Sequence, residues 1–316
     1  MKLRLVFMGT PEAAVPTLRR CVEDGHDVAA VWTQPDRPAG RGNKLAVPPV
    51  KEYALGQGIP VHQPLKIKTD EARELFASHD ADAAIIVAYG RILPSSFLSA
   101  PRRGCINVHF SLLPKYRGAA PVNWAIVRGE SVSGVTTMLI DEGLDTGAIL
   151  LQHAIAIGEA ETAPQLLERL ASTGADLLSD TLERLDQIEP RVQNETEATL
   201  APVLRREDGR IDWSGSAFEI ERRVRGLQPW PNAYTEHDRR RLVIWRAEAR
   251  GLSSDNNEGE AGEPGTVTMT DAESLFVACG DASVLRLLEV QLEGKRRMSA
   301  RNFLNGVRVR VGERLG

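Results

Sequence analysis

Short apolar runs of strand length alternate with helical segments through the first half of this chain, and this alternation most restricts the possible folds. It predicts an α/β domain with a mainly parallel sheet covered on both faces, and such sheets bind ligands at the carboxyl ends of their strands. We expect strands at residues 3–7, 26–32, 83–88, 105–109 and 135–140. We expect helices at residues 12–23, 70–78 (after a Thr69 cap), 94–99, 121–128 and 162–186.

Side chains suited to carbonyl chemistry lie in and after the strand expected at residues 105–109. In the segment INVHFSLLPKYRGAAP, Asn107 and His109 are two positions apart, so an extended chain points both to one face. An amide can donate to a carbonyl oxygen, and an imidazole exchanges protons near neutral pH. Asp145, in the downstream segment DEGLDTG, could orient the imidazole or raise its basicity. These three residues are candidate catalytic groups for attack on a carbonyl-like centre, without an obvious covalent nucleophile.

Other catalytic arrangements have less support in the sequence. Cys105 could act as a thiol nucleophile, but residues i and i+4 of a strand lie about 13 Å apart, which favours a buried cysteine. Ser111 lacks a G-x-S-x-G elbow. The turn Gly9-Thr10-Pro11 lacks both the G-x-G-x-x-G spacing and a P-loop, so NAD and ATP are not expected. The remaining histidines have no metal-ligand spacing, and no metal site is predicted.

Composition limits the class of protein more than its function. The chain has 316 residues, 42% hydrophobic and 26% charged, as expected of a soluble globular protein, and its net charge of −4 says little about partners. Three widely spaced cysteines offer no disulfide framework and fit a reducing, cytoplasmic location. The apolar run at the N-terminus is too short for a signal peptide, and no run has the length of a membrane span.

The sequence changes character after the long helix. Residues 189–203 are rich in Glu, Thr and Pro and are expected to form a linker. Beyond them, short apolar runs at residues 241–246, 265–269, 274–278 and 283–290 are separated by turns and predict a small antiparallel barrel. The expected organisation is a catalytic domain at 1–188, the linker, and a C-terminal domain at 204–316.

Basic residues gather in a polar loop at residues 33–47 and again in the C-terminal part. Each group could be an ordinary solvated surface or could bind the phosphates of a nucleic acid. The loop follows the second strand, at the sheet edge where His109 is expected, which favours a role at the site. The candidates for phosphate contact are Arg37, Arg41 and Lys44 in the loop, and Arg223, Lys295 and Arg296 in the C-terminal part.

Several segments together resemble one known family. GTPEAAVPTL, TQPDRPAGRGNKL, INVHFSLLPKYRGAAP, DEGLDTG, VRGLQPWPNA and GKRRMSARNFLNG occur in the order found in the methionyl-tRNA formyltransferase family, over nearly the whole chain. The NVH, SLLP and RGAAP block with the aspartate motif is specific to folate-dependent formyltransferases. The basic loop and the C-terminal motifs narrow the resemblance to the enzymes that act on tRNA.

The resemblance implies a Rossmann-like catalytic domain, an OB-like C-terminal barrel and a monomer that contributes to translation initiation. It implies 10-formyltetrahydrofolate as formyl donor and the α-amino group of methionyl initiator tRNA as acceptor. The family's catalytic residues fall on Asn107, His109 and Asp145, its tRNA-contacting loop on residues 33–47, and its folate-contacting segment on Ser111, Leu112, Leu113 and Pro114. Two residues depart from the family pattern. Phe110 stands where a small residue is usual, and Ala13 replaces a usual Phe.

Other functions remain open at this point. A formyltransferase acting on an amino sugar or a purine precursor, or a formyl-folate hydrolase, would share the catalytic block without needing the basic loop. An RNA-binding module on a catalytically idle domain would leave His109 a structural role. A Cys/His hydrolase using Cys105 is the remaining alternative.

Overall fold

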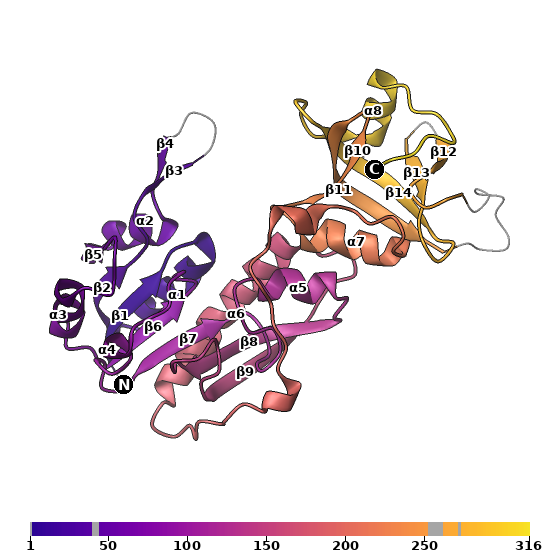
Figure 1. Ribbon diagram of the computed structural model, residues 1–316. Helices are drawn as coiled ribbons and strands as arrows, with labels where there is room; N and C mark the ends of the chain where they lie inside the picture. The colour runs from indigo at the N-terminus through magenta and orange to yellow at the C-terminus, as the bar shows by residue number, and fades with distance from the viewer. Residues whose placement is uncertain (1, 40–43, 252–261, 271–272) are drawn as a thin grey trace. The chain divides into compact units, whose positions relative to one another are not determined.

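The structure, a computed structural model, forms two compact units, each described separately below (Figure 1). The described residues are 2–39, 44–251, 262–270 and 273–316. Unit 1 contains Met1–Pro121, Val132–Ala156 and Leu167–Pro202, and unit 2 contains Val122–Ser131, Ile157–Leu166 and Val203–Gly316. Within the described ranges, no helix combines the length and the apolar character needed to cross a membrane.

Unit 1 is built on a mixed sheet. Its described strands lie in the order β5-β2-β1-β6-β7-β8-β9. Neighbours from β5 to β7 are parallel, whereas β8 is antiparallel to β7 and β9 is antiparallel to β8. The α/β prediction with a mainly parallel, Rossmann-like sheet is confirmed, and the antiparallel edge adds β9, which was not predicted. The strand bounds are β1 Arg4–Gly9, β2 Asp27–Trp32, β5 Val61–His62, β6 Ala83–Val87, β7 Cys105–His109, β8 Val132–Leu139 and β9 Ile149–Ala156.

Helices cover both faces of this sheet. On one face, Met8 of β1 belongs to the same buried cluster as Phe76 of α3 (Asp70–Ser78) and Phe97 of α4 (Ser95–Leu98). Helix α3 begins as predicted, because the Thr69 side chain accepts the Ala72 N–H at 3.2 Å. The other face is covered by α6 (Ala163–Glu183), and α1 (Val15–Glu23) is joined to α6 by the Arg20–Asp176 ion pair. Helices α2 (Pro49–Gly56) and η1 (Glu12–Ala14) complete the N-terminal half.

The predicted polar loop at residues 33–47 contains a short hairpin. Strand β3 (Arg37–Ala39) pairs with β4 (Lys44–Ala46) in antiparallel register, and the hairpin projects away from the sheet (Figure 1). Its base is held by Asp36, whose carboxylate accepts from Gln63 at 2.7 Å and from Lys51 at 2.8 Å. These two contacts hold the pKa of the Asp36 carboxyl below its ordinary value. Asp36 therefore connects the base of the hairpin to Lys51 of α2 and to Gln63 after β5.

Unit 2 contains an antiparallel sheet in the order β10-β11-β14-β13-β12, with β15 paired to β14. Helix α7 (Ala217–Gly226) starts with a capping box, in which Ser216 and Glu219 each accept the other's backbone N–H. The predicted antiparallel strands are confirmed, whereas closure into an OB-like barrel stays a prediction. The remaining bounds are α5 Pro121–Val127, η2 Glu195–Glu197, η3 Arg206–Gly209, β10 Ala233–His237, β11 Arg240–Arg250, β12 Val267–Thr270, β13 Leu275–Ala278, β14 Val284–Leu292, β15 Met298–Ser299 and α8 Ala300–Gly306.

Candidate active site

A pocket of about 470 Å³ opens at the carboxyl ends of β6 and β7 in unit 1. Asn107 and His109, two residues apart on β7, both line it, and Asp145 reaches it from the loop after β8. The three predicted catalytic residues therefore share one pocket. This volume is within the range of small-molecule sites.

The two ring nitrogens of His109 each face an oxygen atom, and one of the two contacts is a hydrogen bond. Its Nε2 lies 3.0 Å from the Tyr116 backbone oxygen, and its Nδ1 lies 3.8 Å from Asp145 Oδ2. Because a carbonyl oxygen only accepts, Nε2 carries the hydrogen and donates it to Tyr116. Nδ1 of the neutral ring therefore keeps a free lone pair, and a proton captured there faces the Asp145 carboxylate. The His109 side chain is 7% exposed and the Asp145 side chain 17%, so this pair is largely shielded from water.

The loop that carries Asp145 is tightly constrained. Asp145 has a φ of 54°, the left-handed region that few non-glycine residues adopt, and its carboxylate accepts the Gly118 N–H at 2.8 Å. Asp141 closes the start of the loop by accepting from Gly143 N–H at 3.0 Å and the Thr146 hydroxyl at 2.6 Å. At Gly147 a Cβ would lie 1.7 Å from the Leu139 oxygen, so only glycine fits there.

Unlike the side chains of His109 and Asp145, the Asn107 amide has no hydrogen-bond partner among the described residues. It is half-buried and lines the pocket, and its strand neighbours are Ile86 on β6 and Met138 on β8. An unpaired donor held on a central strand is available to a ligand. Together the three residues can donate to a developing oxyanion and receive a proton beside it.

The rest of the pocket is mainly apolar and comes largely from residues 88–93 and 140–144 and from Gly118, Ala119 and Pro121. Residues 88–93, which follow β6, were not predicted to be part of the site. They lie at the carboxyl end of a parallel strand next to β7, where such sheets bind ligands, so the rule used for His109 also applies to them. At the opening, Ile92 and Leu144 are large apolar side chains that are 78% and 58% exposed. The apolar lining residues include Ile86, Ile92, Leu93, Val108, Phe110, Ile140 and Leu144.

The Phe110 ring lies near a glycine on α6, Gly174. The ring is buried, and a Cβ at Gly174 would lie 3.5 Å from Phe110 Cε1, 2.9 Å from Val108 Cγ1 and 3.3 Å from Val135 Cγ1. Because 3.5 Å is an ordinary van der Waals distance and 2.9 Å is too short, the missing side chain at position 174 leaves room for Val108 rather than for Phe110.

The predicted folate segment, residues 111–114, is not among the residues that line this pocket. It is attached to β8 and β9 instead. The Ser111 oxygen accepts from the Thr136 hydroxyl at 2.7 Å, and the Leu113 oxygen accepts from Gln152 at 2.8 Å. Leu112 lies against Gly134, and Leu113 packs with Met138 and Ile149. The folate role of Ser111, Leu112, Leu113 and Pro114 stays a prediction.

The predicted tRNA-contacting residues lie in both units. Arg37 is exposed on β3 and donates to Gln34 at 3.4 Å, Lys44 is the first residue of β4, and Arg41 lies outside the described residues. In unit 2, the half-buried Arg223 donates to the Asp208 backbone oxygen, which ties up part of its guanidinium. Lys295 and Arg296 are exposed between β14 and β15.

Cys105 does not have the properties of a nucleophile. It is 2% exposed, its thiol donates to the Phe97 oxygen at 3.4 Å, and burial raises its pKa to about 12. Since the thiolate is the reactive form, this cysteine is inert near neutral pH. The hydrolase alternative based on Cys105 is therefore wrong.

Comparison with known proteins matches both units of the chain. Residues 1–182 match the family described as formyl transferase, and residues 203–308 match the formyl transferase C-terminal domain. The methionyl-tRNA formyltransferase of Geobacter sulfurreducens is 46% identical over 99% of this chain and 97% of its own length. That of Acidobacterium capsulatum is 51% identical over 99% of this chain and its whole length.

The chain belongs to the methionyl-tRNA formyltransferase family. It is therefore a formyl-transferring enzyme, as the sequence motifs predicted.

Solved structures at lower identity share the fold of this chain. One is WlaRD, a sugar 3N-formyl transferase solved in the presence of dTDP and 5-N-formyl-THF. Its TM-score is 0.67 at 19% identity, and the match covers 94% of this chain and all of the WlaRD chain. HypX from Aquifex aeolicus, in complex with tetrahydrofolic acid, has a TM-score of 0.63 at 16% identity, over 96% of this chain and 47% of its own.

Proposed function

We propose that this protein transfers the formyl group of 10-formyltetrahydrofolate to the α-amino group of methionyl initiator tRNA, in the cytoplasm, for translation initiation. The observation that carries the proposal is that Asn107, His109 and Asp145 line one pocket. The chain is also similar over nearly its full length to methionyl-tRNA formyltransferases. The folate co-substrate is supported by solved structures of the same fold that are complexes with tetrahydrofolic acid or folinic acid.

The chemistry follows from the geometry of the three residues. The neutral amine attacks the formyl carbon, and the negative charge that develops on the formyl oxygen is stabilised by the Asn107 amide, assisted by His109 when protonated. The amine's proton passes to the His109–Asp145 pair, directly or through water. The bond from carbon to the folate nitrogen breaks and that nitrogen takes up a proton. The products are formylmethionyl-tRNA and tetrahydrofolate, with no covalent enzyme intermediate.

The pocket suits a flat heteroaromatic donor. Its apolar side chains, including Ile92, Ile140 and Leu144, offer surfaces for a ring, and the backbone of residues 89–93 and 141–143 offers polar groups for the ring edge. The segment 111–114 is assigned to folate by the family resemblance. Because this segment is attached to β8, we expect it to position the loop that leads from His109 to Tyr116. It does not line the 470 Å³ pocket itself.

We assign tRNA contact to the basic hairpin and to the C-terminal unit. This unit is proposed to be an OB-like domain at residues 204–316, joined through residues 189–203 to a catalytic domain at 1–188, in a monomeric protein. Phosphate binding is the role expected of exposed cations on such surfaces. The residues proposed for it are Arg37, Arg41, Lys44, Arg223, Lys295 and Arg296.

A small-molecule acceptor is the second candidate. Its support is the shared fold with sugar N-formyltransferases, all 20% identical or less in the cases compared. Relatives that are 46–51% identical over the full length favour the tRNA acceptor.

The two candidates are separated by an acceptor panel. The purified protein is incubated with 10-formyltetrahydrofolate and, in separate reactions, methionyl initiator tRNA, uncharged initiator tRNA, free methionine and a nucleotide-linked amino sugar. We expect formylation of the charged tRNA only, because uncharged tRNA lacks the α-amino group of the methionyl residue and the small amines lack the tRNA contacts. Formylation of the amino sugar at a comparable or higher rate, or release of formate with every acceptor, would contradict the proposal.

A further inference from the structure

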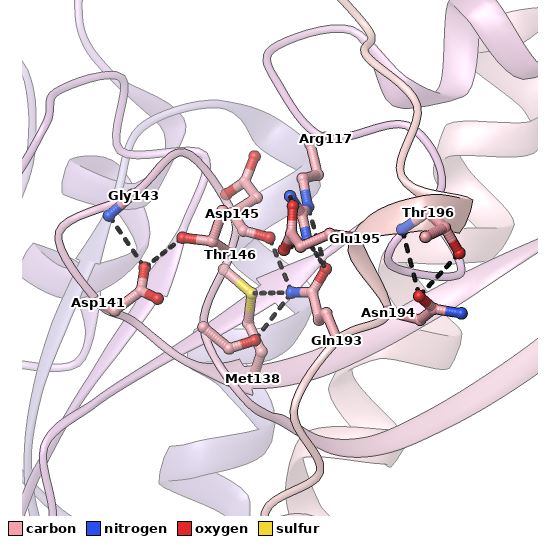
Figure 2. Close-up of polar contacts among 11 residues, drawn as sticks. Arg117, Met138, Asp141, Gly143, Asp145, Thr146, Gln193, Asn194, Glu195 and Thr196 are labelled. Carbon is pink, nitrogen blue, oxygen red and sulfur yellow. Dashed lines mark hydrogen bonds and ion pairs between the residues drawn. The ribbon is translucent and has the colours of Figure 1, made fainter.

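Gln193 is a buried residue in a segment that the sequence predicted to be a linker. It is 5% exposed, while residues 189–192 and 194–197 are exposed on either side of it. Its side-chain nitrogen donates to the Asp145 backbone oxygen at 2.8 Å (Figure 2). The same nitrogen donates to the Gly147 backbone oxygen at 2.8 Å. One amide thus binds both ends of the turn that presents the Asp145 carboxylate.

The orientation of this amide is dictated by its partners. Its oxygen accepts from Arg117 Nε at 3.0 Å and from Arg117 Nη2 at 2.9 Å, on the side opposite the two carbonyl groups (Figure 2). Donors face the oxygen and acceptors face the nitrogen, so a flipped amide would lose every one of these contacts. Arg117 is itself buried and uses its remaining donors on Glu195, at 2.7 and 2.9 Å.

The same segment also holds the other partner of His109. Tyr116, whose backbone oxygen faces His109 Nε2, has a φ of 64°, and its N–H donates to the Thr199 hydroxyl at 2.9 Å. Both residues that flank the imidazole therefore have left-handed backbones, which cost about 1–3 kcal/mol each and persist only when surrounding contacts fix them. Residues 193–199 supply such contacts to both.

We propose that Gln193 is a positioning residue for the reaction, holding Asp145 against the His109 imidazole through the Asp145 and Gly147 carbonyls. This inference rests on the proposed function, because it assigns Asp145 a role in the formyl transfer step. It gives the segment at residues 189–203 a part in catalysis in addition to its expected role as a linker.

The test replaces Gln193 in two ways. Gln193→Leu removes both sets of hydrogen bonds. Gln193→Glu keeps an acceptor for Arg117 but turns an oxygen toward the two carbonyl groups, so it isolates the contact with the Asp145 turn. The matched control is Gln228→Leu in unit 2, because Gln228 also donates to two backbone carbonyls, those of Val224 and Trp245, at 2.9 Å each.

We expect both Gln193 variants to lower kcat by about 10- to 100-fold, the range produced by misplacing a reacting group by up to 1 Å. KM for 10-formyltetrahydrofolate should change by less than about twofold, since the pocket walls are untouched. The control should lose comparable thermal stability and keep its kcat. Gln193→Glu keeps the test valid if the leucine variant does not fold.

The decisive readout combines each change with Asp145→Asn. If Gln193 acts through Asp145, then Gln193→Glu should lower kcat by less than about threefold in that background. The same fold-loss in both backgrounds, or a wild-type kcat in the single variants, would overturn the positioning role. If instead Asp145→Asn alone leaves kcat unchanged, the proposed catalytic site fails, and this outcome is distinct from failure of the Gln193 role.

Discussion

Asn107→Ala should separate catalysis from stability, because the Asn107 amide has no partner in the described part of the protein. Removing it breaks no protein hydrogen bond and leaves no buried donor or acceptor unpaired, and the β7 backbone remains paired with β6 and β8. The free energy of unfolding should therefore change by less than about 0.5 kcal/mol.

The effect on the reaction should be much larger. A donor aimed at a developing oxyanion contributes about 2.7–4 kcal/mol to the transition state. This corresponds to a loss of about 100- to 1000-fold in kcat. Folate affinity should be nearly unchanged, because the apolar walls of the pocket keep their shape.

The assay is single-turnover formyl transfer to methionyl initiator tRNA, measured beside urea unfolding of the same preparation. Asn123→Ala is the matched control, because the half-buried Asn123 amide donates to the Gly226 oxygen at 2.7 Å and to the Gln228 oxygen at 3.4 Å. This variant should lose about 1–3 kcal/mol of stability by leaving acceptors unpaired and should keep its rate. The reasoning is refuted if Asn107→Ala keeps a near-wild-type rate, or if it is destabilised as much as the control.

The remaining predictions concern backbone space, charge and thiols. Gly147→Ala should lose more than about 2 kcal/mol of stability by urea unfolding, because the new Cβ would lie 1.7 Å from a backbone oxygen, whereas Gly56→Ala, with nothing within 4 Å, should be neutral or stabilising. An equal effect of both would contradict this. Burial raises the pKa of the Cys105 thiol from an ordinary value of 9.0 to about 12, so iodoacetamide at pH 8 should leave activity intact. The free energy of unfolding should fall as the pH rises above about 9, because the thiol ionises first in the unfolded chain. Rapid inactivation of the folded enzyme would refute the inert thiol. Finally, Arg37, Arg41 and Lys44 of the loop at residues 33–47 can be neutralised. The slope of log tRNA affinity against log salt concentration should then become less steep by about 0.7–0.9 per lost phosphate contact. An unchanged slope would exclude a role of these residues in phosphate binding.

Local patterns were sufficient to predict the strand that carries two of the three proposed catalytic residues, Asn107 and His109. The apolar run at residues 105–109 and the spacing of Asn107 and His109 fix which side of a strand both side chains occupy, and the structure has this strand as β7. The Asp145 loop could be proposed from its acidic residues. Its left-handed backbone and its distance from His109 depend on contacts with Gly118 and Gln193, which no local pattern encodes.

Contacts between residues that lie far apart in the sequence could not be predicted from local patterns. Gln193 meets Arg117 and Asp145 across separations of 76 and 48 residues, and its neighbours have the exposed, polar composition of a linker. Strand β9 was missed because it lies at the sheet edge, where its outer half is mostly exposed and carries little apolar periodicity. The hairpin β3–β4 was hidden in a segment rich in Pro and Gly, residues that are depleted from strands.

The central claim is that the Asp145 carboxylate, 3.8 Å from the His109 imidazole, helps to remove the amine's proton in the transfer step. The most direct test is the single-turnover rate of Asp145→Asn with saturating 10-formyltetrahydrofolate and methionyl initiator tRNA, together with the affinity for the folate. The account predicts a rate lower by about 100- to 10,000-fold with folate affinity unchanged. A rate close to wild type, or a loss of folate affinity that accounts for the whole decrease, would contradict it.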